Sequence, residues 1–478
     1  MVNGNFIAGQ WVTGTTGFLS TNPSDTSDVL GEFSEASADS VRAAIDAAAA
    51  AFPKWSRSPI HRRFEILDAV GTELLARRDE LGRLLSREEG KVLKDGTAEI
   101  ARAGMVFKFA AGEAVRLAGE AISSTRPGIE VEVSREALGA IAVITPWNFP
   151  FAIPAWKIAP ALACGCTVVF KPASFVPACA TALVEILHRN GVPEGVVNLV
   201  MGRGSTIGDV LIPDARIAGV TFTGSVGVGR SIAGRCASRG ARVQVEMGGK
   251  NPLVVLDDAD LERAIRIAVD GAFFQTGQRC TASSRLIVAR GVHDRFVQGV
   301  RERLQSLVVD HALKEATDIG PVVDAKPMRE IVESIEAARR DGAILAQGGE
   351  VLQRETNGHY LSPALFVGST NAMSINQTEV FGPVAAVIEV AGYDEALAVA
   401  NDTEFGLSAG ICTQSLKYAR DFRRNAEAGL VMVNLPTAGL DFHVPFGGRK
   451  ASNYGPREQG SYAREFFTIV KTSYTDPT

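Results

Sequence analysis

The segment "TVVFKPASFVPACATALVEILHRNG" (residues 167–191) indicates the fold class, because it places a short apolar strand before a helix. Its first part, "TVVF", is apolar and rich in β-branched residues, as is typical of a strand buried on both faces. The helical part runs until Gly191 ends it. A further apolar stretch, "VVNLVMG" (196–202), follows. A strand, a helix and a strand in succession predict a parallel sheet with helices on its faces.

Similar units follow this segment. A strand "IAGVTFTGS" (217–225), a helix "VGVGRSIAGRCASRG" (226–240) and a strand "RVQVEMGG" (242–249) come next. A second series starts at "NPLVVLDDADLERAIRIAVDGAFF" (251–274) and runs to residue 450. Since a single hydrophobic core stops growing near about 250–300 residues, a chain of 478 residues is expected to form more than one domain. We therefore predict an α/β protein with two doubly wound parallel-sheet domains.

Three other segments complete this organisation. Residues 37–118 are predicted to be helical, because they are rich in alanine and keep apolar residues at spacings of three and four. Residues 130–137 alternate valine with charged residues, which indicates an exposed strand. The tail "REFFTIVKTSYTDPT" (464–478) predicts a closing strand, and both strands suit a contact between subunits.

Composition and charge exclude several classes of protein. Apolar residues make up 46% of the chain and charged residues 22%, which excludes a disordered chain and a polytopic membrane protein. The net charge of -5 includes no long basic block, so neither a nucleic acid nor an anionic membrane is an expected partner. Because the amino terminus shows no secretory signal, we expect a cytoplasmic protein.

Six cysteines in a chain of this length do not indicate a disulfide framework. Cys164 and Cys166 lie in an apolar segment without a second pair nearby, so no metal site is expected. Cys280 differs, because it lies in the polar segment "FFQTGQRCTASS" (273–284). A reactive thiolate needs positive or hydrogen-bond-donating surroundings, which Arg279 and the loop N–H groups are placed to provide. Cys280 is a candidate nucleophile, although a single cysteine in a loop is more often inert.

Further polar residues follow predicted strands. Asn148 lies in the stiff loop "TPWNFP" (145–150), where an Asx turn is the alternative role. Lys171 ends a buried strand, and Glu246 comes before two glycines in "VEMGGKNP" (245–252). "FTGSVGVGRSIAG" (222–234) joins a strand to a helix through glycines, which suits either a phosphate at the helix amino terminus or a tight turn alone.

Together these segments resemble the aldehyde dehydrogenase superfamily. Motifs in its order and spacing cover essentially the whole chain: "PWNFP" (146–150), "KPAS" (171–174), "FTGSVGVG" (222–229), "EMGGK" (246–250), "GQRCTAS" (277–283), "EVFGP" (379–383) and "PFGGRKASNYGPREQG" (445–460). The resemblance implies a dinucleotide-binding domain, a catalytic domain and a small β oligomerisation flap, in a homodimer or homotetramer. The dinucleotide-binding domain corresponds to residues 1–119 and 138–248. The catalytic domain corresponds to residues 249–450, and the flap to residues 120–137 together with the tail 451–478.

The resemblance also implies a mechanism. Cys280 is expected to attack an aldehyde, while the Asn148 side-chain amide and the Cys280 N–H hold the resulting oxyanion. Glu246 is expected to activate the water that hydrolyses the thioester, with Glu458 as a proton relay. Such an enzyme oxidises an aldehyde to a carboxylic acid.

The expected cofactor is NAD or NADP. The resemblance assigns three groups of residues to it: Lys171 and Ser174 at the adenosine ribose, Gly224, Ser225 and Gly229 at the pyrophosphate, and Glu379 with Phe381 at the nicotinamide ribose. The same site is expected to include Thr145, Pro146 and Trp147. A glutamate is common at the position of Ser174 in NAD-preferring relatives, and its absence predicts that NADP is tolerated.

Substrate identity is predicted from two motifs, "GQRCTASSRLIV" (277–288) and "GLDFHVPFGGRKASNYGPREQG" (439–460). They most resemble bacterial α-ketoglutaric semialdehyde dehydrogenases, whose substrate carries a carboxylate. Arg279, Ser284 and His443 are candidates to bind that carboxylate, and a structural ion pair is the alternative for Arg279. Trp156 stands where succinic semialdehyde dehydrogenases have an arginine, which disfavours that substrate. A broad-specificity aldehyde dehydrogenase is the other alternative.

Three rival functions are weighed against this one. A catalytically silent nucleotide-binding structural protein would not need Cys280, Glu246 and Asn148 together. A cysteine hydrolase would need a histidine partner for Cys280, and the motif around it has none. Dehydrogenases that acylate coenzyme A lack the general-base glutamate, so Glu246 favours water as the acceptor.

Overall fold

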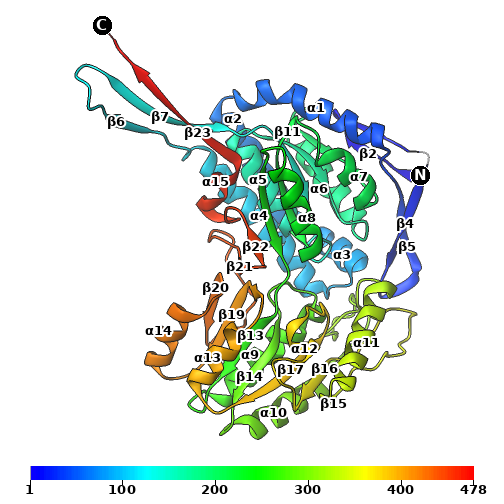
Figure 1. Ribbon diagram of the computed structural model, residues 1–478. Coiled ribbons are helices and arrows are strands. Elements are labelled where there is room, and N and C mark those ends of the chain that lie inside the picture. The colour runs from blue at the N-terminus through cyan, green and yellow to red at the C-terminus, as the bar shows by residue number, and fades with distance from the viewer. Residues whose placement is uncertain (1, 15, 478) are drawn as a thin grey trace.

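The computed structural model describes residues 2–14 and 16–477. Two large sheets, each covered by helices, form the two halves of the molecule, and a small sheet projects from the first half near the carboxyl terminus (Figure 1). The predicted α/β class is confirmed. Among the helices described, none has the length and apolar character needed to cross a membrane.

The first half contains an eight-stranded sheet whose five central strands are parallel. Its spatial order is β22 (Asn453–Tyr454), β12 (Arg242–Met247), β11 (Ile217–Gly224), β8 (Ala140–Ile144), β9 (Thr167–Lys171), β10 (Val197–Leu199), β2 (Asn5–Ile7) and β3 (Gln10–Val12). From β8 the chain runs outward through β9 and β10, and then returns to the other side of β8 with β11 and β12. The carboxyl ends of strands at such a switch point, here between β8 and β11, form a crevice that binds ligands.

Helices cover both faces of this sheet, because successive residues of a strand point in opposite directions. Ala140 and Ala142 of β8 pack against one layer, and Ile141 and Val143 pack against the other. The first layer consists of α1 (Ala38–Ser56), α7 (Gly204–Leu211) and α8 (Val226–Ala237). The second consists of α2 (Ile60–Ala76), α3 (Arg78–Glu89), α4 (Leu93–Ala114), α5 (Ala152–Cys164) and α6 (Pro177–Arg189). The predicted helices and strands of this half are confirmed.

The second half contains a seven-stranded sheet that is parallel except at one edge. Its order is β15 (Ile344–Gln347), β16 (Ala364–Val367), β17 (Val384–Val390), β14 (Ser283–Ala289), β13 (Asn251–Val255), β19 (Ser408–Cys412) and β20 (Leu430–Val433). The helices of this half are α9 (Leu261–Phe273), α10 (His293–Gln305), α11 (Ala325–Arg340), α12 (Ser374–Gln377), α13 (Tyr393–Asn401) and α14 (Leu416–Asn425). This half is doubly wound as predicted.

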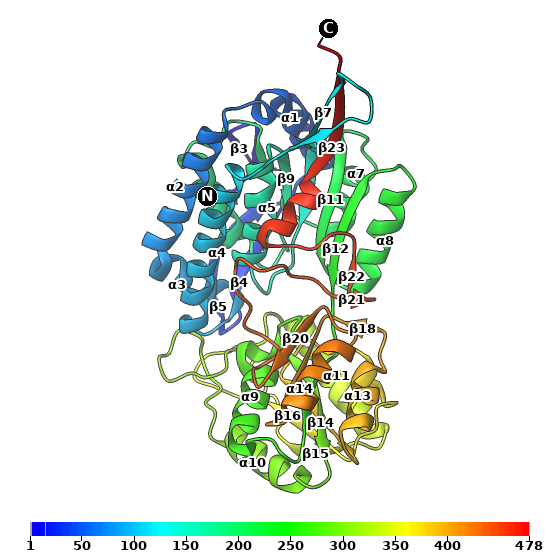
Figure 2. The same cartoon turned by 90° about the vertical axis from the view of Figure 1, so that its left-hand side faces the viewer.

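The projecting sheet is antiparallel and pairs distant parts of the chain. Its strands are β6 (Glu120–Ser123), β7 (Glu130–Ala137) and β23 (Thr468–Thr475), with β7 in the centre. Figure 2 shows the same sheet rising from the top of the molecule, next to the carboxyl terminus. The strands predicted at 130–137 and in the tail are confirmed. Of the predicted tail range 451–478, β22 lies in the eight-stranded sheet instead.

The remaining elements lie outside these three sheets. They are β1 (Val2–Asn3), β4 (Gly17–Asn22) and β5 (Asp25–Ser34) in an amino-terminal sheet, β18 (Phe405–Gly406) paired with β21 (Arg449–Lys450), the 3-10 turns Phe274–Gly277 and Gly460–Ala463, and α15 (Arg464–Phe467). The amino-terminal strands carry no pattern that our sequence analysis detected.

Candidate active site

A cavity of about 310 Å³ is lined by residues of both halves. The loop after β8 and the ends of β11 and β12 contribute Pro146, Trp147, Asn148, Thr223, Gly224, Ser225, Glu246, Met247 and Gly248, and α5 contributes Ile153 and Trp156. The rest of the chain contributes Cys280, Pro327, Glu330, Glu379, Val380, Phe381, Leu407 and Phe446. The structure therefore brings Cys280, Asn148 and Glu246 together in one cavity.

Cys280 follows a sharp turn of the backbone. Gln275, Thr276 and Gly277 have φ angles of 54°, 57° and 62°, three left-handed residues in succession. A Cβ on Gly277 would lie 2.1 Å from the main-chain oxygen of Gly382, so this position requires glycine. Left-handed backbone costs free energy in other residues and persists where the surroundings impose it, which is common at functional sites.

Asn251 fixes the main chain at Cys280. Its Nδ2 donates to the carbonyl of Cys280 at 2.8 Å and to that of Ala282 at 2.9 Å. Its Oδ1 accepts from the N–H of Ser408 at 3.0 Å. Asn251 thus ties the Cys280 loop to β13 and β19. Asn251 lies in "VEMGGKNP", where no local sequence signal indicates this role.

The Cys280 thiol is held in its protonated form. Burial raises its pKa to about 12, and the negative charges of Glu379 and Glu246 add to that rise. The N–H groups of Cys280 and Thr281 lower this pKa, as expected of hydrogen-bond donors in the loop. Arg279 and the Cys280 sulfur do influence each other electrostatically. The pKa of the thiol nevertheless stays raised, so it must lose its proton before it can attack.

Arg279 points its guanidinium at the end of helix α9. Its Nη2 donates to the carbonyl of Asp270 and, at 3.1 Å, to that of Gly271. These are hydrogen bonds to the main chain, whereas the alternative weighed from the sequence was an ion pair. Arg279 does not line the cavity.

Asn148 is buried beside the Cys280 loop, with a side chain that bridges the two halves. Its Nδ2 donates to the carbonyl of Gln278 at 2.9 Å. An amide nitrogen carries two donor hydrogens. Among the described residues no second acceptor is bonded to it, which leaves one N–H for a ligand in the cavity.

Glu246 is buried at the end of β12. Its Oε2 accepts from the N–H of Gly448 at 3.3 Å, and its Oε1 accepts from Asn453. Burial raises its pKa well above the usual value, and the charge of Glu458 raises it further. A carboxyl group with a raised pKa next to a cavity is a candidate for proton transfer.

Glu458 lies behind Glu246 in a buried ion pair. Its Oε1 contacts the ammonium of Lys157, whose Nζ also donates to Thr221 at 2.8 Å. The other carboxylate oxygen, Oε2, is buried without a hydrogen-bond partner among the described residues. Lys157 was not predictable from the sequence, because 301 residues separate it from Glu458 along the chain.

The crevice at the switch point offers a cation and a free helix end. Lys171 is 8% exposed, its ammonium makes no hydrogen bond or ion pair with the described residues, and burial lowers its pKa to about 8. Ser225 is the N-cap of α8, and its side chain makes no capping bond there. A Cβ on Gly229 would lie 2.6 Å from the Met247 sulfur, so the first turn of α8 packs closely on the sheet. An unpartnered ammonium and open helix N–H groups suit a phosphorylated ligand such as a dinucleotide.

Other residues expected at the cofactor lie in or next to the same crevice. Ser174 donates to the carbonyl of Gly202 at 3.1 Å, and the N–H of Thr145 donates to the carbonyl of Lys171 at 3.1 Å. The Thr145 hydroxyl is buried without a partner among the described residues. Pro146 and Gly224 line the cavity itself.

Glu379 and Phe381 approach the cavity from the second half. Glu379 accepts from the N–H of Gly249 at 3.0 Å, and burial raises its pKa to about 7. Phe381 has a left-handed φ of 56°, and its ring lies edge-on to Trp147 with centroids 5.5 Å apart. This aromatic pair closes one side of the cavity.

The other residues expected to bind substrate are placed differently from one another. Trp156 lines the cavity and stacks on Phe446, with ring centroids 5.4 Å apart. Ser284 does not line it, and its hydroxyl is buried without a partner in the part of the chain that the structure describes. His443 is exposed and does not line the cavity either.

Arg102, on α4, is a cation that the sequence analysis missed. Its guanidinium carbon lies 5.5 Å from the centroid of the Trp156 ring, and its Nη2 donates to Gln459 at 3.3 Å. Burial lowers its pKa, and the negative charges of Glu99 and of a Cys280 thiolate oppose that shift. Its Nε is buried without a partner among the described residues. No local signal marks one arginine of a long helix as functional.

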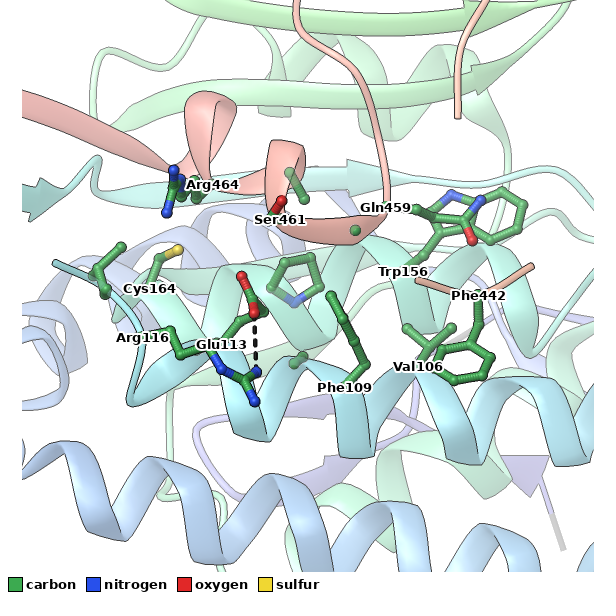
Figure 3. A pocket seen from close by; sticks show the side chains of 16 residues that line it. Val106, Phe109, Glu113, Arg116, Trp156, Cys164, Phe442, Gln459, Ser461 and Arg464 are labelled. Atoms are coloured by element: carbon green, nitrogen blue, oxygen red, sulfur yellow. Dashed lines mark hydrogen bonds and ion pairs between the residues drawn. The ribbon is translucent and has the colours of Figure 1, made fainter. Parts of the chain in front are cut away.

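A small second cavity lies on the other side of Trp156 (Figure 3). Its walls are mostly apolar, with Val106 and Phe109 from α4 and Phe442 from a later loop, and Gln459 lies beside Trp156. Trp156 is therefore a wall shared by both cavities.

Comparisons with known proteins agree with this site. Residues 11–473 match the aldehyde dehydrogenase family. The alpha-ketoglutaric semialdehyde dehydrogenase of Bacillus subtilis is 40% identical over 477 residues, covering 99% of this chain and 98% of that protein. The alpha-ketoglutarate semialdehyde dehydrogenase of Haloferax volcanii is 42% identical, covering 98% of each chain.

Solved structures are equally similar in fold. Betaine aldehyde dehydrogenase from Staphylococcus aureus in complex with NAD+ has a TM-score of 0.97 at 32% identity, covering 99% of this chain and 94% of that chain. An NADP-dependent enzyme from E. coli has a TM-score of 0.95 at 34% identity, covering 99% of this chain and 98% of that chain. The predicted family, fold and class of oxidoreductase are confirmed: the chain belongs to the aldehyde dehydrogenase family.

Proposed function

We propose that this enzyme oxidises α-ketoglutaric semialdehyde (2,5-dioxopentanoate) to 2-oxoglutarate, with NAD or NADP as the hydride acceptor. The observation that carries the proposal is the presence of Cys280, Asn148 and Glu246 in one cavity. The substrate follows from the relatives of Bacillus subtilis and Haloferax volcanii, which are named for it. The succinate-semialdehyde dehydrogenase of E. coli is 35% identical, and this makes succinic semialdehyde the second candidate.

In the first step Cys280 attacks the aldehyde carbon. Because the thiol has a raised pKa, it must lose its proton to solvent in the cavity as the S–C bond forms. The new S–C bond converts the carbonyl oxygen into an oxyanion. The free N–H of the Asn148 amide and the N–H of Cys280 are the donors that stabilise it.

In the second step the C–H bond of the tetrahedral adduct breaks, and loss of its hydride leaves a thioester on Cys280. When bound, the nicotinamide cofactor supplies the hydride acceptor. Glu246 then removes a proton from water, which attacks the thioester, breaks the S–C bond and releases the carboxylic acid. The proton then leaves through Glu458. Its Oε2 has no hydrogen-bond partner among the described residues and can accept a proton, and Lys157 contacts its other carboxylate oxygen.

The crevice between β8 and β11 fits the cofactor. Lys171 and Ser174 are proposed to bind the adenosine ribose and any 2′-phosphate on it. The pyrophosphate is proposed to bind at the amino terminus of α8, next to Gly224, Ser225 and Gly229. Glu379 and Phe381 are proposed to hold the nicotinamide ribose. The remaining contacts of this site are assigned to Thr145, Pro146 and Trp147.

Arg102 is our candidate for the substrate carboxylate. No residue that lines the cavity carries a positive charge, yet the substrate holds a carboxylate at the opposite end of its carbon chain from the aldehyde. Arg102 lies against the ring of Trp156, which lines the cavity. Arg279 is held by main-chain carbonyls, which makes it the weaker choice.

The proposal extends to domain roles and assembly. The first half is the dinucleotide-binding domain, the second the catalytic domain, and β6, β7 and β23 form a flap that pairs subunits in a homodimer or homotetramer. The exposed strands of this flap support the assignment, because unpaired strand edges favour association. A cytoplasmic location agrees with six cysteines that are all free.

The experiment is a comparison of kcat/KM for 2,5-dioxopentanoate, succinic semialdehyde, glutaric semialdehyde and pentanal, each with NAD and with NADP. We expect 2,5-dioxopentanoate to exceed pentanal by about tenfold or more, since pentanal lacks the carboxylate and a lost charge-assisted bond costs about 1.5–3 kcal/mol. We also expect it to exceed the other two semialdehydes, which keep a carboxylate but lack the 2-oxo group. Equal values for pentanal would overturn the substrate, and no cofactor reduction with any aldehyde would overturn the activity.

A further inference from the structure

A second buried ion pair lies directly behind the loop that carries Asn148. Lys91 precedes α4, and Glu99 lies within it. The Lys91 Nζ and the Glu99 Oε2 are 2.7 Å apart, and their side chains are only 1% and 2% exposed. A buried ion pair is rarely a net gain in stability over apolar residues of similar size, so its retention calls for another role.

Lys91 contacts the residue that we propose as oxyanion donor. Its Nζ donates to the main-chain carbonyl of Asn148 at 2.8 Å and lies 4.0 Å from the centroid of the Phe149 ring. The ammonium therefore holds the main chain of Asn148, while the carbonyl of Gln278 accepts from the Asn148 side chain.

Glu99 accepts hydrogen bonds from the other end of the same loop. Its Oε1 accepts from the N–H of Phe151 at 2.9 Å and from that of Ala152 at 3.1 Å. These groups lie at the amino terminus of α5, where the N-cap residue Phe151 offers no side-chain acceptor. A carboxylate at this position replaces the missing cap and is favoured by the helix dipole.

We propose that Lys91 and Glu99 are positioning residues that fix residues 148–152, and with them the oxyanion-binding amide of Asn148. The pair joins both ends of this loop to α4 through three main-chain bonds and one ion pair. A displacement of about 1 Å at a catalytic group can cost about 10²-fold in rate, so a rigid clamp behind the donor has a direct effect on turnover. The inference rests on the role that the proposed function gives to Asn148.

The test is a double-mutant cycle between Lys91→Met and Asn148→Ala. Lys91→Met should lower kcat by about tenfold or more, with the dissociation constant of NAD changed less than about threefold, because only the oxyanion donor is displaced. In the Asn148→Ala background the same change should cost no more than about twofold, since the donor is already gone. Losses that multiply in the double variant would overturn the inference.

Two further variants keep the test decisive. Lys91→Met leaves Glu99 buried without its partner, and the buried carboxyl of Glu89 also loses the charge of Lys91. Lys91→Met with Glu99→Gln removes one of these unpaired acids, so it should be more stable than Lys91→Met alone while losing the same kcat. Wild-type kcat in that variant would overturn the clamp. Lys108→Met is the control. Lys108 lies on α4 and forms an ion pair with Asp68, with a distance of 2.8 Å between the charged atoms. Neither residue lines the cavity. If Asn148→Ala itself leaves kcat unchanged, the proposed function fails instead.

Discussion

The side-chain amide of Asn148 donates to the main-chain carbonyl of Gln278 at 2.9 Å, two residues before Cys280. This bond joins the loop after β8 in the first half to the nucleophile loop of the second half. Because the bond uses only one hydrogen of the amide, the same side chain can hold the Cys280 loop and donate to an oxyanion. The first prediction follows from this double use.

Asn148→Ala should lower kcat by about 10²–10³-fold, the usual cost of one oxyanion donor, with little change in cofactor affinity. The measurement is steady-state turnover together with NAD binding by fluorescence titration. An increase in KM without a loss of kcat would assign Asn148 to ground-state binding.

Arg102 and Arg279 provide a matched pair of variants. Arg102→Leu should raise KM for 2,5-dioxopentanoate by about tenfold or more and leave KM for pentanal nearly unchanged, because only the first substrate loses a charge-assisted bond. Arg279→Leu should lower the melting temperature and change KM for both substrates by the same factor, because the Arg279 guanidinium donates to main-chain carbonyls. The reverse pattern would give the carboxylate to Arg279.

Ser174 is expected to permit NADP. The buried Lys171 ammonium lacks a partner among the described residues and can bind a 2′-phosphate, so wild-type kcat/KM with NADP should lie within about tenfold of that with NAD, or about 1.4 kcal/mol. Ser174→Glu should lose NADP activity selectively, because a carboxylate repels the phosphate. Rejection of NADP by several hundredfold in the wild type, or equal loss of both cofactors in the variant, would show that another residue sets the choice.

The pKa of Cys280 makes a prediction about its chemical reactivity. The Glu379 charge raises that pKa, so Glu379→Gln should lower it and speed alkylation by iodoacetamide, which reacts with the thiolate. Since the pKa of Glu379 is about 7, the acceleration should be large at pH 8 and small at pH 6. Each unit of pKa is worth about tenfold in thiolate at a pH well below it. Glu330→Gln, in the same cavity, is the control, and an equal rate in all three proteins at pH 8 would contradict the electrostatic cause.

Much of this architecture was predictable from the sequence. The segment 167–191 folds as β9 and α6, since a β-branched run and helical spacing are local signals. The loop around Cys280 was identified because its polar, glycine-containing sequence contrasts with the surroundings of the other cysteines. Local sequence patterns of this kind therefore predict the strands, the helices and the loop that carries the nucleophile.

Residues that act across long sequence separations were not predictable. Lys91 reaches Asn148 across 57 residues and Lys157 reaches Glu458 across 301, and neither pairing leaves a mark on the local sequence. The direction of the Arg279 side chain was also missed, because residues adjacent in sequence can point to opposite sides of a loop. Likewise, the raised pKa of Cys280 depends on burial and on two distant carboxylates.

Acid-quenched mass spectrometry of Glu246→Gln, mixed with NAD and 2,5-dioxopentanoate, tests the proposed chemistry most directly. Glutamine keeps the shape of the side chain but cannot take the proton of the hydrolytic water, so thioester formation should outrun its hydrolysis. We predict a rapid burst of reduced cofactor and an acyl adduct on the peptide that contains Cys280, absent from quenched Cys280→Ala. A burst without an adduct, or an adduct on another cysteine, would contradict covalent catalysis by Cys280.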